Sequence, residues 1–130
     1  MASNAPYLFS SLTLEGFRQK VHLGCGEEER RVPQFVQFNV EIRFSALPQG
    51  CLTDDLEDTV CYAEMSEALR EICQRSEYRL IEKLGWTAYS TLKKQLPPTV
   101  KLRIKLIKEK PPVPDLLNGS SFCVGDWAEG

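Results

Sequence analysis

Histidine is nearly absent from this sequence, since His22 is the only one among 130 residues. The five cysteines are an odd number and form no Cys-x-x-Cys pair. The sequence therefore has neither the ligand spacing of a structural zinc site nor the pattern of a disulfide framework. A serine or cysteine nucleophile would depend on His22 alone as its base. We expect reduced thiols, no bound metal and no nucleophile activated by histidine.

Long apolar runs and an excess of positive charge are also missing. No window approaches the roughly 18 apolar residues that a membrane helix needs, and residues 1–9 lack the basic and apolar stretches of a signal peptide. Sixteen Lys and Arg residues stand against eighteen Asp and Glu residues, for a net charge of −2. Such a balance supplies no basic field for a nucleic-acid backbone. The sequence predicts a cytoplasmic protein with no membrane and no nucleic-acid partner.

The composition that remains is typical of a globular protein. Hydrophobic residues make up 42% of the chain and charged residues 26%, which suits a single core in a chain of this length. Residues 1–10 are small, polar and unpatterned, and we expect them to form a loose leader. Residues 11–130 are expected to form one domain.

Apolar and polar residues alternate in several stretches, as they do in strands with one buried face. The alternation is clearest from Val36 to Phe44. The stretch 22–31 lacks it, and its two glycines and run of charges predict a loop. One strand is expected to begin at Ser11. Three more are expected at residues 36–44, 100–106 and about 120–127.

Between the second and third of these strands the apolar period changes to that of a helix. An acidic, turn-forming segment, residues 48–62, comes first. A second helix is expected from about Leu80 to Gln95, because Pro97 and Pro98 prevent its continuation. The first helix should bury Met65, Ala68, Leu69, Ile72 and Cys73, and the second should bury Ile81, Leu84, Ala88 and Leu92.

The expected order of elements is therefore ββααββ. Two pairs of strands separated by two helices predict an α+β fold, in which one four-stranded antiparallel sheet carries both helices on its apolar face. Such a sheet has two open edges, which need protection or a partner chain. We expect the chain to form oligomers by pairing of edge strands.

Five segments in this order resemble the dihydroneopterin aldolase family and its close relative, dihydroneopterin triphosphate epimerase. The resemblance spans about Leu12 to Trp127, and both groups are members of the tunnelling fold. The segments are Leu14-Glu-Gly-Phe-Arg, Gly24-Cys-Gly-Glu-Glu-Glu29, Asp54-Asp-Leu-Glu-Asp-Thr-Val-Cys-Tyr62, Leu80-Ile-Glu-Lys-Leu84 and Lys108-Glu-Lys-Pro-Pro-Val-Pro114.

The resemblance implies a function in folate biosynthesis. The family cleaves 7,8-dihydroneopterin by a retro-aldol reaction into 6-hydroxymethyl-7,8-dihydropterin and glycolaldehyde, without a metal or an organic cofactor. The substrate's own C=N bond accepts the electrons, so no lysine imine is needed. The resemblance also implies a homo-oligomer, a tetrameric ring or an octamer, with a pterin site between subunits.

Two residues of these segments have the central implied roles. Glu82 matches the glutamate that anchors the pterin ring, and a carboxylate suits that edge because its two oxygens can accept two parallel N–H donors. Lys108 matches the catalytic lysine. Its position continues the even-numbered apolar stripe from Val100, so its stem should start on the buried face, where low dielectric favours proton transfer. Lys110 has the same parity and is the alternative if the register is off by two.

The remaining implied site residues come from three of the segments. Tyr62 matches a tyrosine that takes part in proton transfer, and a phenol suits a proton donor better than a base at pH 7. Glu29 matches a glutamate that contacts the substrate's hydroxylated tail. The resemblance further implies that the substrate site is lined by Val60, Cys61, Leu80 and Ile81.

Some positions depart from the aldolase pattern. His22 is displaced from the histidine-glycine pair of many aldolases, and Cys61 stands where many have His or Asp. The Gly-x-Gly-Glu-Glu-Glu form is similar to the epimerase branch, which acts on the triphosphate ester, whereas Lys-x-x-Pro-Pro-x-Pro is similar to the aldolase branch. The alternatives to an aldolase are a 2′-epimerase and a noncatalytic oligomer that binds pterins or purines.

Overall fold

The computed structural model describes residues 8–128 of the chain. The predicted leader, residues 1–10, lies mostly outside this range, although the carbonyl of Ser10 already accepts a hydrogen bond from the backbone N–H of Phe44. The elements in chain order are β1 (Ser11–Val21), α1 (Glu27–Arg31), β2 (Gln34–Phe44), α2 (Gly50–Thr53), a short 3₁₀ helix η1 (Leu56–Asp58), α3 (Tyr62–Arg75), α4 (Ile81–Gln95), β3 (Val100–Lys108) and β4 (Ser120–Gly125).

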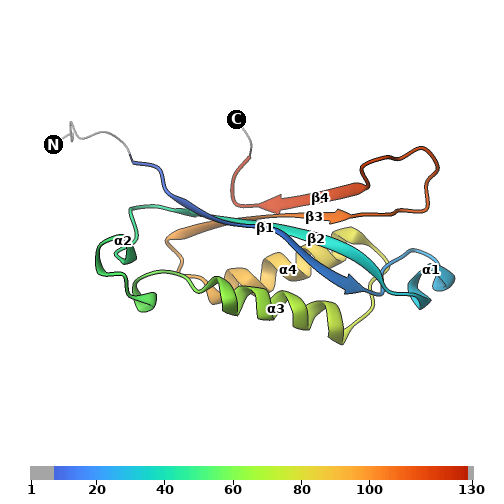
Figure 1. Ribbon diagram of the computed structural model, residues 1–130, viewed down its shortest axis with the longest axis horizontal. Helices are drawn as coiled ribbons and strands as arrows, with labels where there is room; N and C mark the ends of the chain where they lie inside the picture. Colours follow the sequence, from blue (N-terminus) through green and yellow to red (C-terminus); the bar gives the residue numbers. More distant parts are fainter. Residues whose placement is uncertain (1–7, 129–130) are drawn as a thin grey trace.

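The four strands form one antiparallel sheet in the order β1-β2-β3-β4. Both long helices, α3 and α4, cover the same face of this sheet, and the opposite face carries no helix among the described residues (Figure 1). The predicted α+β fold with ββααββ order is confirmed. Strands β1 and β4 are the two edges.

The core lies between the sheet and the two helices, as the sequence periods predict. Even-numbered residues from Val36 to Ile42 in β2 and from Val100 to Leu106 in β3 are buried, and Phe38 and Leu106 are 0% exposed. A Cβ at Gly85 of α4 would lie 2.7 Å from the ring of Phe122 in β4, which is too close for two carbon atoms. Glycine at that position therefore lets the helix approach the edge strand.

The expected loops contain short helices that the apolar pattern did not predict. The stretch 22–31 includes α1, and the acidic segment 48–62 includes α2 and η1. These helices are too short to show an amphipathic period. In α1, three glutamates at the start and two arginines at the end suit the helix dipole instead.

The last strand ends at Gly125, two residues earlier than expected, because Asp126 anchors the chain behind it. The Asp126 carboxylate accepts hydrogen bonds from the hydroxyl of Tyr89, the ammonium of Lys93 and the backbone N–H of Leu102. The backbone N–H of Asp126 in turn donates to the carbonyl of Leu102. The end of β4 is thereby fixed to both α4 and β3. Within residues 8–128, no helix has the length and apolar character to cross a membrane.

Candidate active site

An ion pair joins two of the predicted site residues at one end of the sheet. Lys108, the last residue of β3, places its Nζ 2.7 Å from Oε2 of Glu29 in α1. The two side chains are 12% and 24% exposed. The buried start of the Lys108 stem confirms the parity argument, whereas Lys110 lies past the end of the strand and is exposed.

Glu29 is held in its charged form by its surroundings. The hydrogen bond with Lys108 lowers the pKa of Glu29, and this effect outweighs desolvation, which raises it. Hydrogen bonds from the Gln34 side chain, at 3.3 Å, and from the Cys25 backbone lower the pKa further. The site therefore presents a carboxylate and an ammonium in contact, only partly exposed to water.

A buried arginine shapes the loop that carries Glu29. Arg30 is 8% exposed and donates from Nη1 to the carbonyls of Gly24 and Cys25, each at 3.0 Å. Its Nε donates to Glu77 at 3.1 Å. A Cβ at Gly24 would lie 2.5 Å from the Glu29 side chain. The absence of a side chain at Gly24 is thus what allows Glu29 to fold back toward Lys108.

Gln34 and Arg30 were not predicted as parts of the site. Gln34 bridges the site, since its Nε2 donates to the Leu23 carbonyl as well as to Glu29. A signal for Gln34 was present in the sequence, because it continues the even-numbered stripe of β2 backward from Val36, as Lys108 continues that of β3. No such signal marked Arg30, because in the sequence it is one charged residue in a run of five and nothing distinguishes it from its exposed neighbours.

The start of α4 lies at the same end of the sheet. Leu23 pairs with Tyr78, just before α4, in an isolated parallel bridge, and Gly24 donates its N–H to the Tyr78 carbonyl. Leu80, Ile81 and Glu82 follow at once. Leu80 is 50% exposed, Ile81 packs partly against the core, and Glu82 is exposed. In a single chain the proposed ring anchor is therefore open to water.

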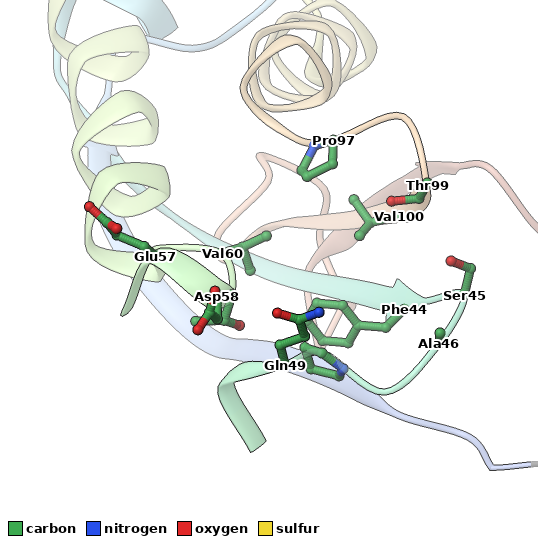
Figure 2. Close-up of a pocket in the computed structure, with 12 residues that line it drawn as sticks. Phe44, Ser45, Ala46, Gln49, Glu57, Asp58, Val60, Pro97, Thr99 and Val100 are labelled. Atoms are coloured by element: carbon green, nitrogen blue, oxygen red, sulfur yellow. The ribbon is translucent and has the colours of Figure 1, made fainter. Parts of the chain in front are cut away.

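Val60, Cys61 and Tyr62 lie at the opposite end of the sheet. Val60 lines a cavity of about 370 Å³ at the junction of β2 and β3, and Figure 2 shows Val60, Val100 and Phe44 among the side chains that surround it. Cys61 lines a neighbouring cavity of about 350 Å³. Tyr62 begins α3 and is 59% exposed.

The predicted site residues thus form two separate groups. Val100 and Lys108 are the two ends of nine-residue β3, and at about 3.3 Å per residue those ends are roughly 26 Å apart. One group comprises Glu29, Leu80, Ile81, Glu82 and Lys108, and we call it the lysine half-site. The other comprises Val60, Cys61 and Tyr62, and we call it the tyrosine half-site. A two-ring substrate is too short to reach from one half-site to the other within one chain.

The residues that the structure describes include no cluster of three or more His, Cys, Asp or Glu side chains that could hold a metal ion. All five cysteines, which fall within the described range, are free thiols. The lysine half-site itself offers a carboxylate and an amine that can exchange protons with a hydroxylated ligand, and a second carboxylate, Glu82, that can accept hydrogen bonds.

Comparison with known proteins places this arrangement in one family. The family model described as FolB, dihydroneopterin aldolase, matches residues 12–124. A protein of Chlamydia trachomatis named "Probable dihydroneopterin aldolase" is 35% identical over 118 residues, which cover 90% of this chain and 95% of that protein.

Two solved structures share the fold at low sequence identity. Escherichia coli dihydroneopterin aldolase in complex with neopterin superposes with a TM-score of 0.77, at 19% identity, over 91% of this chain and 99% of that one. Dihydroneopterin aldolase of Burkholderia thailandensis bound to guanine gives 0.69, at 19% identity, over 93% of both chains. From the family match and the 35% identical relative together, the chain belongs to the FolB dihydroneopterin aldolase family.

Proposed function

We propose that the chain cleaves 7,8-dihydroneopterin by a retro-aldol reaction into 6-hydroxymethyl-7,8-dihydropterin and glycolaldehyde, in a site that two copies of the chain complete together. The observation that carries this proposal is the contact between Glu29 and Lys108 beside the start of α4, at 2.7 Å. It supplies proton-transfer groups next to a carboxylate suited to the pterin ring, in a member of the aldolase family.

Glu82 is assigned to the ring. Its carboxylate accepts hydrogen bonds from the 2-amino group and the adjacent ring N–H, and two such bonds to an ionised acceptor are stronger than neutral ones. Guanine carries the same pair of donors on one edge, and the Burkholderia structure holds guanine. Leu80 and Ile81, which precede Glu82, provide an apolar surface beside the ring.

Lys108 and Glu29 are assigned to the substrate's hydroxylated tail. Cleavage begins when a base removes the proton of the hydroxyl on the second side-chain carbon. The bond between the first and second side-chain carbons then breaks, its electron pair moves into the C=N bond of the dihydropterin, and glycolaldehyde leaves. We assign the removal of the proton to Lys108 in its neutral amine form, after its ammonium has released a proton to water, and we assign to Glu29 the contact with the tail that brings the hydroxyl to Lys108.

Tyr62 is assigned to the last step, in which the enol intermediate is protonated. The phenol is exposed at the start of α3, and its hydroxyl can donate a proton to an intermediate bound beside it. Because the tyrosine half-site lies at the far end of β3, the Tyr62 that acts on a given substrate belongs to a neighbouring copy, together with Val60 and Cys61.

The sheet supports such an assembly. Edge strands β1 and β4 are open on the two sides of each chain, and pairing of β1 with β4 of the next copy would satisfy both edges and close a ring. We propose a closed homo-oligomer, a tetrameric ring or an octamer of two rings, with a pterin site at each junction. We also propose a cytoplasmic location, for which five free thiols are the usual state.

Product analysis tests the reaction. Chromatography after incubation with 7,8-dihydroneopterin should show 6-hydroxymethyl-7,8-dihydropterin and glycolaldehyde in equal amounts. Formation of the 2′-epimer alone would assign the chain to the epimerase branch. Binding of neopterin without any turnover would assign it to the noncatalytic pterin-binding oligomers.

Subunit mixing tests the shared site. Tyr62→Phe and Glu82→Ala alter different half-sites, so random mixing at equal amounts should restore about one quarter of the sites in a closed ring. Lys108→Ala and Glu82→Ala alter the same half-site, and their mixture is the control that should gain nothing. Equal behaviour of the two mixtures, with subunit exchange shown by mass spectrometry, would mean that each chain carries its own complete site.

A further inference from the structure

A third cavity lies on the face of the sheet that the helices leave uncovered. It has a volume of about 320 Å³. Arg43 and Lys101 are paired across β2 and β3 and alternate with the buried Ile42 and Leu102, which places both cations on the uncovered face. We call this cavity the Arg43 pocket, and it is lined by Phe9, Arg43, Phe44, Ser45, Thr99, Lys101 and Trp127.

The polar side chains of the Arg43 pocket all carry hydrogen-bond donors. They are a guanidinium, an ammonium, two hydroxyls and an indole N–H, and none of the described residues that line the cavity carries a carboxylate. A ligand that offers several acceptors and negative charge matches this set, whereas a cation or a ligand rich in donors does not.

Two of these donors are buried without an acceptor. The Nε of Arg43 and the Nε1 of Trp127 are inaccessible to solvent and have no hydrogen-bond partner. The carboxylate of Glu41 lies 3.6 Å from the Arg43 Nε, which is beyond hydrogen-bond distance. Buried donors are nearly always paired in native proteins, so these two orphans show that the residues around the cavity lack acceptors of their own.

Aromatic rings hold the Arg43 guanidinium in place. Its Cζ lies 4.3 Å from the ring centre of Trp127 and 5.2 Å from that of Phe9. A guanidinium packed against aromatic rings keeps its planar set of donors ready for an oxyanion. Lys101 beside it is exposed and makes no ion pair with any carboxylate in residues 8–128, so its charge is available to the same ligand.

The rest of the uncovered face carries charges of both signs. Arg18 and Lys20 of β1 and Lys105 of β3 lie on it, opposite Gln37, Phe35 and Asn39 of β2 respectively. Glu41 lies on the same face and pairs with Arg103 at 3.1 Å, and Glu109 pairs with Arg18 at 2.8 Å. The attraction for an anion therefore comes from Arg43 and Lys101 of the pocket itself.

We propose that the Arg43 pocket binds a phosphate group, either as inorganic phosphate or as the phosphate of an organic ester. A tetrahedral oxyanion has enough acceptors for the guanidinium, the ammonium and the hydroxyls at once, and phosphate suits the bidentate geometry of arginine. The volume of about 320 Å³ leaves room for an organic part as well. The pocket lies at the Val100 end of the sheet, away from Glu29 and Lys108 of the same chain.

Titration calorimetry of the whole protein at constant ionic strength tests the proposal, with inorganic phosphate, adenosine 5′-monophosphate and adenosine as probes. Phosphate and the nucleotide should bind saturably, and Lys101→Ala and Arg43→Gln should each weaken that binding at least tenfold, about 1.4 kcal/mol. Lys105→Ala removes the same charge from the same face outside the cavity and should change the dissociation constant less than twofold. Lys101 is exposed, so its variant remains informative if Arg43→Gln does not fold.

The outcomes separate the sources of the phosphate and can overturn the proposal. Tighter binding of the nucleotide than of phosphate identifies an ester site, and equal binding identifies an inorganic phosphate site. Absence of saturable phosphate binding, or equal loss in Lys101→Ala and Lys105→Ala, overturns the proposal. Binding of adenosine as tight as that of its monophosphate also overturns it, as does loss of phosphate binding in Glu82→Ala, which would place the phosphate in the pterin site.

Discussion

Replacing Gly24 by alanine should separate Glu29 from Lys108 without unfolding the chain. The added Cβ would lie 2.5 Å from Cγ, Cδ and Oε1 of Glu29, whereas carbon atoms in contact stay about 3.5 Å apart or more. Glu29 must therefore move by about 1 Å. The distance of 2.7 Å between Lys108 Nζ and Glu29 Oε2 would then grow beyond the limit of a hydrogen bond.

The expected effect is on turnover. A misplacement of about 1 Å in a catalytic group can cost on the order of 100-fold in rate, so we expect kcat with 7,8-dihydroneopterin to fall by roughly 30- to 100-fold. The pKa of Glu29, which the hydrogen bond with Lys108 lowers, should rise toward its ordinary value, as carboxyl ¹³C NMR titration can show. The melting temperature should change little, because the partly exposed Glu29 side chain can turn outward.

Gly26→Ala is the matched control, two residues away in the same loop. A Cβ there meets nothing within 4 Å, and Gly26 has an ordinary φ of −92°. Its kcat should stay within about twofold of the parent, since the added methyl contacts neither Glu29 nor Lys108. Alanine is a poorer N-cap than glycine, so the melting temperature of both variants is measured beside kcat. Parental turnover in Gly24→Ala would show that catalysis does not need Glu29 beside Lys108. Equal losses in both variants would point to the loop as a whole instead of this contact.

Three further predictions concern single side chains. Glu82→Gln should weaken neopterin binding by about 2–4 kcal/mol, because an ionised acceptor is lost and an amide N–H then faces a ring donor; an unchanged dissociation constant in calorimetry would remove Glu82 from the anchoring role. Tyr62→Phe should slow protonation of the enol, so that oxidised pterin forms under air and not under argon; the parent product ratio in both atmospheres would contradict that role. The hydrogen bond from Arg18, together with a smaller effect of that from Gln37, lowers the pKa of Glu109 from 4.5 to about 2. Glu109 therefore stabilises the fold above pH 4.5, and this stabilisation is lost as the pH falls toward 2. Glu109→Gln should accordingly lower the melting temperature at pH 7 more than at pH 3, and an equal effect at both values would disprove the linkage.

The sequence predicted those parts of the fold that repeat over many residues. Each long strand and helix shows its apolar period several times, so the buried faces of β2, β3, α3 and α4 were all predicted. The same parity located Lys108, because a strand fixes which face each residue occupies. Helix α1 was missed because five residues contain little more than one turn.

Contacts between distant segments were harder to predict for a physical reason. Arg30 is buried because backbone carbonyls of its own loop accept hydrogen bonds from it. The residue types of the loop do not indicate where those carbonyls point. Tyr62 begins α3 and Lys108 ends β3. Their separation depends on the end of the sheet at which α3 begins, and the antiparallel topology, not the local sequence pattern, determines that end. The motifs predicted the candidate site residues, and the fold shows that one chain does not bring Tyr62 and Lys108 together.

The anchor at Asp126 determines where the edge strand β4 can open. An edge strand of six residues would ordinarily fray from both ends, but the end after Gly125 is held by Tyr89, Lys93 and Leu102. Opening must therefore start at the other end, where Ser120 pairs with Lys108 and the exposed loop 109–119 extends beyond the sheet (Figure 1). Amide hydrogen exchange should accordingly be fastest near Ser120 and slow steadily toward Asp126, so that the most mobile backbone of the sheet lies beside Lys108, to which we assign the removal of the substrate's proton.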